Sequence, residues 1–289
     1  MKRGIGIDFL LLFSGMSWGM GYIFSKIALD SGFGAPLMIF LRFAVSATLF
    51  IIIIWIKKEK IRKTEMTIGM ISGTMLFFGY YLQLFGLRFT TPSANALLSS
   101  TSIVILPFVI WIFLKQRPPV KIFAAAFLFV VGVGFLTWRG GSRFVINAGD
   151  VLSLIGATFF ALNTTYLSVR LYKCNPMRLM CVQMLSAATL AAIATGIFDS
   201  ALLMEANYGV GLWAILYLAL VNTGAVLYIQ NYALRRVSSI KVGMYLSTES
   251  LFAAIFSVLL GYESLSISLT IGGVLIFMAI MLMEVKIKK

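Results

Sequence analysis

The chain has 289 residues, of which 60% are hydrophobic and only 12% charged, and its mean hydropathy is +0.97. A soluble globular domain carries roughly twice that share of charged residues, so a soluble fold is excluded and an all-α integral membrane protein is predicted. The net charge of +14 comes from basic residues in short segments between apolar runs, not from one patch, which argues against nucleic acid as a partner. His is absent, and Cys174 and Cys181 fit neither Cys-x-x-Cys spacing nor a disulfide framework, so we expect no metal and no cofactor.

Ten apolar windows are long enough to cross a hydrocarbon core of about 30 Å. The first follows Lys2 and Arg3 and is too long for a cleavable signal peptide, so it is interpreted as an uncleaved first helix. Pro107, inside the fourth window, is a candidate kink. The predicted spans are residues 8–29, 35–56, 67–88, 93–114, 119–138, 150–171, 176–198, 211–233, 239–261 and 267–285.

The distribution of basic residues predicts the orientation of these spans. With both termini in the cytoplasm, 19 of the 24 Lys and Arg residues lie on the inside, and only Arg88, Arg139 and Arg143 lie outside. This bias satisfies the positive-inside rule and would be lost if one middle span were added or removed. We therefore expect a multi-pass protein of the cytoplasmic (plasma) membrane, the inner membrane where a cell has two.

The two halves of the chain repeat one another. Asp8 to Leu29 aligns without gaps over Asp150 to Leu171, which pairs Trp18 with Phe160. Further along, Tyr81, Leu87, Arg88, Ser100 and Thr101 fall on Tyr228, Leu234, Arg235, Ser247 and Thr248. Five spans in each half make the copies antiparallel, so we expect two inverted five-helix repeats, residues 8–138 and 150–285, joined by an outside linker at 139–149.

Polar residues near the centres of spans predict a central cavity, because a polar side chain facing lipid is costly. Aromatic rings with amides and hydroxyls suit a small amphipathic solute, although Ser, Thr and Asn also bond neighbouring helices in membrane bundles. The candidate substrate-binding residues are Trp18, Tyr22, Tyr80, Tyr81, Gln83, Asn95, Ser99, Asn163, Asn222, Tyr245 and Thr248.

Two charged residues inside spans have alternative interpretations. Glu249 is the only acidic residue near the middle of a span. It is a candidate for coupling or gating, as a protonatable group or a contact for a cationic solute, or it fixes the bundle by hydrogen bonds. Arg42 lies in the outer third of the second span and could contact an anion, extend towards the interface, or bind backbone carbonyls.

Four segments of the chain form a recognisable set: GMSWGMGYIFSKIA in the first span, LRF around Arg42, TPSANALLSSTSIVILPFVIWIFLKQRP and SSIKVGMYLSTESLFAAIFSVLLGYESLS. Together they resemble the ten-span EamA-type permeases of the drug/metabolite transporter superfamily. The spacing of Glu249 and Glu263 is similar to the family's EP…GE pattern, but Ser250 replaces its proline and Gln116 stands for the glutamate in the first repeat. The resemblance implies a carrier of small metabolites, frequently amino acids, that does not hydrolyse ATP.

The predicted function is secondary transport of a small organic metabolite by alternating access, with export of a solute such as an amino acid as the expected direction and cargo. No GxxxxGK loop occurs, which excludes transport driven by ATP within this chain. The alternatives are a multidrug or organic-cation exporter that exchanges protons and, in a different class, an intramembrane enzyme or a lipid-carrier module. Catalysis is disfavoured because there is no His and only one central acid. The expected partners are the solute and the lipid bilayer, while the oligomeric state, including a homodimer, stays open.

Overall fold

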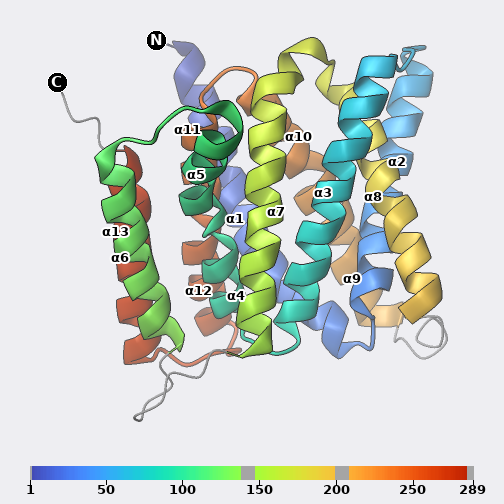
Figure 1. Cartoon of the computed structure of the whole chain (residues 1–289). Helices are drawn as coiled ribbons and strands as arrows, with labels where there is room; N and C mark the ends of the chain where they lie inside the picture. The colour runs from blue at the N-terminus through green and yellow to red at the C-terminus, as the bar shows by residue number, and fades with distance from the viewer. Residues whose placement is uncertain (1, 138–146, 199–207, 285–289) are drawn as a thin grey trace.

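A computed structural model describes residues 2–137, 147–198 and 208–284, in which helices run roughly parallel to one axis and no strand occurs (Figure 1). Most of the predicted linker, residues 139–146, lies outside the described residues. The first repeat contains α1 (Lys2–Asp30), α2 (Ala35–Ile56), α3 (Lys63–Leu87), α4 (Pro92–Ser99), α5 (Ser102–Leu114) and α6 (Val120–Thr137). The second contains α7 (Ala148–Arg170), the short η1 (Leu171–Lys173), α8 (Pro176–Phe198), α9 (Tyr208–Tyr217), the π-helical η3 (Leu218–Ala225), α10 (Val226–Leu234), α11 (Ser239–Leu246), α12 (Glu249–Leu259) and α13 (Ile267–Glu284).

Helix ends follow the local capping signals of the sequence. Thr91 accepts a hydrogen bond from Ala94 N before α4, and Ser238 accepts one from Lys241 N before α11. At the start of α7, Asn147 and Asp150 form a reciprocal capping box. These contacts satisfy amide groups that the helix itself leaves unbonded.

Eight of the described helical segments are long and apolar enough to cross a membrane. Two shorter apolar helices, Val120–Gly132 and Ile267–Ala279, occupy the predicted fifth and tenth windows, so those two crossings stay a prediction. The outer surface carries large apolar side chains, such as Trp55, Phe127 and Leu259, with about three quarters of each exposed. Such a surface is suited to lipid rather than water.

The fourth and ninth windows, predicted as continuous, are each interrupted after about two turns. The interruptions fall at Ser100–Thr101 and at Ser247–Thr248, which the repeat alignment pairs. Thr101 Oγ1 donates to Leu98 O and Thr248 Oγ1 to Tyr245 O, both at 2.6 Å, so hydroxyls compete with the helical hydrogen-bond ladder. Pro107, the candidate kink, lies inside α5 and not at this interruption, so a kink there stays a prediction.

The repeats run in opposite directions and interleave. In Figure 1, α1 descends from the upper end of the bundle, whereas α7 rises from the lower end. Helices pack across the repeats in matched pairs. The contact between α1 and α12 has its counterpart in the contact between α7 and α5. The contact between α3 and α7 has its counterpart in the contacts of α9 and α10 with α1. Helix α2 packs on its counterpart α8, and α6 packs on α13. The centre of the molecule is therefore an interface between the two copies.

Small residues permit these close approaches. A Cβ atom added to Gly19 of α1 would lie 2.6 Å from Phe252 Cβ and 2.8 Å from the backbone nitrogen of Ala253 in α12. Only glycine allows α1 to lie directly against α12 at this point.

Candidate functional site

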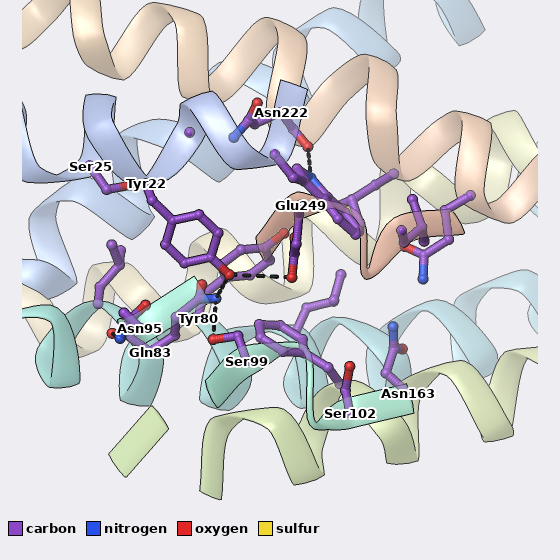
Figure 2. Close-up of a pocket in the computed structure, with 18 of the residues that line it drawn as sticks. Tyr22, Ser25, Tyr80, Gln83, Asn95, Ser99, Ser102, Asn163, Asn222 and Glu249 are labelled. Carbon is purple, nitrogen blue, oxygen red and sulfur yellow. Dashed lines mark hydrogen bonds between the residues drawn. The ribbon is translucent and has the colours of Figure 1, made fainter. Parts of the chain in front are cut away.

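A cavity lies at the interface between the repeats, where α1, α2, α3, α4, α5, α7, η3, α10 and the α11–α12 segment meet (Figure 2). The space open to the centres of water molecules is ≈ 80 Å³, enough for several waters or a small solute. The lining is mixed, with aromatic, amide, hydroxyl and charged groups beside leucines. It consists of Trp18, Gly21, Tyr22, Ser25, Arg42, Leu76, Tyr80, Gln83, Leu84, Leu87, Asn95, Ser99, Ser102, Phe160, Asn163, Thr164, Asn222, Leu227, Gln230, Gly243, Leu246, Ser247 and Glu249.

Glu249 is the acidic group of the cavity. It is the first residue of α12, directly after the interruption at Ser247–Thr248, where unbonded amide groups of the helix end favour a negative charge. Its side chain is half-buried, and its Oε1 accepts a hydrogen bond of 3.3 Å from the Tyr22 hydroxyl. Within the described residues, no Lys or Arg forms an ion pair with Glu249.

A chain of hydrogen bonds joins Glu249 to the first repeat (Figure 2). Gln83 Nε2 in α3 donates to the Tyr22 hydroxyl and to Ser99 Oγ, each at 2.8 Å. Tyr22 therefore bridges an amide from one repeat and the carboxyl of the other. Since the chain crosses from α3 and α4 through α1 to α12, movement of α12 would change the bonding of the cavity wall.

Arg42 is the basic group of the same cavity. It is only 3% exposed, so it does not extend to the outer interface. Its Nε donates to Thr223 Oγ1 of η3, and its guanidinium carbon lies 4.2 Å from the centre of the Tyr80 ring. Both of these partners are neutral, and in the described part of the chain no carboxylate forms an ion pair with Arg42.

The π-helical segment η3 places Asn222 against α1. The backbone carbonyl of Asn222 accepts a hydrogen bond of 2.9 Å from Trp18 Nε1. The Asn222 side chain is 3% exposed, and its Oδ1 has no hydrogen-bond partner. Short π-helical turns within α-helices occur frequently at functional sites, and this one places Asn222 in the lining of the cavity.

Two further amides support the wall. Asn95 in α4 donates to the backbone carbonyl of Gln83 at 3.1 Å and to Ser153 Oγ of α7 at 2.8 Å, while its Oδ1 lacks a partner. Asn163 Oδ1 in α7 accepts a hydrogen bond from Ser72 of α3. Asn163 thus both lines the cavity and bonds neighbouring helices, so the two sequence-based interpretations of this residue are compatible.

Ten of the predicted site residues lie together in the lining, namely Trp18, Tyr22, Tyr80, Gln83, Asn95, Ser99, Asn163, Asn222, Glu249 and Arg42. Tyr81 does not, because one residue along a helix turns its side chain away from Tyr80, and it stacks on Phe77 and Phe85 instead. Tyr245 packs at the edge of two apolar clusters. Thr248 bonds the Tyr245 carbonyl at the helix interruption and is also absent from the lining.

Phe160 and Gln230 line the cavity but were not among the predicted site residues. The repeat offered a signal for both. Phe160 aligns with Trp18, and the register that pairs Tyr81 with Tyr228 also pairs Gln83 with Gln230. The leucines of the lining carry no such signal, because an apolar residue in an apolar span does not reveal which side it faces.

Fold and cavity together define a class: a polytopic helical membrane protein with a polar cavity between two inverted halves. Comparison with protein families gives the same answer, since residues 5–138 and 147–285 each match the EamA-like transporter family. The chain belongs to this family, and so to the drug/metabolite transporter superfamily.

Two known proteins are similar over almost the whole chain. An uncharacterized transporter from Archaeoglobus fulgidus is 28% identical over 280 residues, which cover 97% of this chain and 86% of that protein. A solved crystal structure of a protein superimposes with a TM-score of 0.72 at 14% identity, covering 96% of this chain and 97% of the other. At that identity, the second likeness concerns the fold alone.

Proposed function

We propose that this protein is a secondary transporter that exports a small organic metabolite, such as an amino acid, without hydrolysing ATP. The observation that carries the proposal is the cavity between the repeats, where aromatic rings, amides and both Arg42 and Glu249 meet. Rings bury the apolar part of a solute while amides and charges orient its polar groups. Membership of a transporter family and the position of the cavity at a repeat interface support the same function.

The proposed mechanism is alternating access. Inverted repeats can exchange their conformations, so that the same interface opens first to one side of the membrane and then to the other. The paired interruptions at Ser100–Thr101 and Ser247–Thr248 are the proposed bending points, because their hydrogen bonds are partly made by side chains. Glu249 follows the second bending point and would connect solute binding to its movement.

One observation favours a second candidate, export of an organic cation in exchange for protons. Glu249 has no basic partner among the described residues, and Trp18, Tyr22 and Tyr80 line the same cavity. A carboxylate with aromatic rings can hold a cation, and the same carboxyl can carry a proton back.

A cargo screen with purified protein in liposomes tests both candidates. Radiolabelled amino acids of several sizes and lipophilic cations would be presented to vesicles with and without the protein, in the absence of ATP. We expect flux of at least one amino acid to exceed the protein-free rate. Flux of cations alone would favour the second candidate, and movement of neither class would contradict both.

A further inference from the structure

Arg42 has no counter-charge in the described structure. The sequence left three roles open for it, and 3% exposure removes the one in which it extends towards the interface. Its Nε bonds the Thr223 hydroxyl and its guanidinium lies over the Tyr80 ring, so its position is fixed by two neutral groups. A buried cation held in this way keeps an attraction for an anion, and its planar fork matches a carboxylate.

Glu249 presents the complementary situation in the same cavity. Its carboxyl accepts one hydrogen bond from Tyr22, and it forms no ion pair with any of the residues that the structure describes. The side chains of Arg42 and Glu249 both line the cavity, yet they do not approach within ion-pair distance of one another. A solute that carries one negative and one positive group can pair with the Arg42 guanidinium and the Glu249 carboxylate at the same time, and such pairing is strong in a low-dielectric cavity.

Resting on the proposed transport function, we propose that Arg42 is the carboxylate-recognition residue of the cavity and that the solute is a small zwitterion whose ammonium group faces Glu249. Thr223 and Tyr80 act as positioning residues for the guanidinium. The cavity, with ≈ 80 Å³ open to the centres of water molecules, is suited to a small solute, and valine, a small amino acid, is the probe chosen to test it.

Three matched solutes test separately the contributions of the ammonium group and of the carboxylate group to binding. L-Valine carries both, L-valinamide keeps only the ammonium group, and 3-methylbutanoate keeps only the carboxylate. Binding of each would be measured on the purified full-length protein in lipid nanodiscs, and flux of each in liposomes. We expect the wild type to prefer valine to both analogues.

Arg42→Gln should weaken valine binding by about 10- to 100-fold, the usual effect of losing a charge-assisted hydrogen bond, and leave valinamide within about threefold. Arg42→Lys should restore part of the preference, since it keeps the charge and loses the fork. Arg88→Gln, which removes an exposed arginine outside the cavity, should bind all three solutes as the wild type does. Thr223→Val keeps the charge of Arg42 but not its orientation, so the ratio of valine to valinamide affinity should fall even if Arg42→Gln does not fold.

A merely structural role for Arg42 would weaken the binding of valine and valinamide equally, and that result would overturn the inference. A wild type that binds valinamide as well as valine would overturn it too, while leaving the transport function intact. If none of the three solutes binds and the cargo screen finds no flux, the proposed function itself fails together with the inference.

Discussion

Glu249 is the residue that distinguishes the two halves of the cavity. The register that pairs Thr101 with Thr248 places Ser102 opposite it in the first repeat, and both residues line the cavity. One carboxyl against one hydroxyl means that the two repeats cannot be chemically equivalent when they exchange conformations. The Tyr22 hydroxyl bonds this carboxyl directly and links it to Gln83 and Ser99.

Substituting Glu249 by Gln should remove the response of transport to a pH gradient. If the carboxyl carries a proton during the cycle, an imposed gradient accelerates solute accumulation by the wild type but not by Glu249→Gln, which has no group to protonate. The measurement is flux into proteoliposomes with and without the gradient. Glu263→Gln is the matched control, because Glu263 accepts hydrogen bonds from Ser93 N and Ser257 Oγ outside the cavity lining. An unchanged response in Glu249→Gln would remove this residue from the coupling mechanism.

At the scale of helices, hydropathy and length predict where a span lies better than they predict its internal shape. The window 35–56 coincides with α2 (Ala35–Ile56), because its sequence is continuously apolar and flanked by clear breaks. The interruption at Ser100–Thr101 and the π-helical η3 were missed, since they depend on side-chain hydrogen bonds and on packing against other helices. The same reason separates Tyr80 from Tyr81, because membership of a cavity depends on the rotation of α3 among its neighbours.

The contact between α1 and α12 can be tested by adding one methyl group. Gly19→Ala should lower the free energy of unfolding by about 1–3 kcal/mol, because the new Cβ would meet the backbone of α12 and the helices would have to separate. Gly196→Ala in α8 is the matched control, since nothing lies within 4 Å of its added Cβ. There, alanine should raise stability by about 0.5–1 kcal/mol through helix propensity. Thermal unfolding in detergent measures both, and equal stabilisation by the two substitutions would contradict the packing described for Gly19.

For the molecule as a whole, repeat register and charge distribution predicted the same architecture for independent reasons. Antiparallel copies require an odd number of spans in each half, and the bias of Lys and Arg to one side gives the same parity. The opposite directions of α1 and α7 in Figure 1 agree with both. The interleaving of the repeats, in which α3 packs on α7 and α2 on α8, was not predicted, because a sequence alignment between copies does not describe contacts between them.

Cysteine labelling tests the predicted orientation. Cys174 and Cys181 are buried and can be replaced by Ser to give a background without reactive thiols. We expect Arg88→Cys to react with an impermeant maleimide in intact cells, and Lys57→Cys to react only after the membrane is opened. Both positions are exposed, and Lys57 directly follows α2 whereas Arg88 directly follows α3, at the opposite end of the bundle. The reverse pattern would place the termini outside and contradict the charge-based orientation.

The most direct test of the central claim is solute counterflow in proteoliposomes. Vesicles loaded with unlabelled valine and diluted into a trace of labelled valine should take up the label transiently above its equilibrium level, because a carrier with alternating access exchanges inner for outer solute. Arg42→Gln should reduce this overshoot by about tenfold or more, in line with the loss of a charge-assisted contact. Uptake that rises only to equilibrium, or that equals the rate in vesicles without protein, would contradict a carrier with its binding site in the cavity between the repeats.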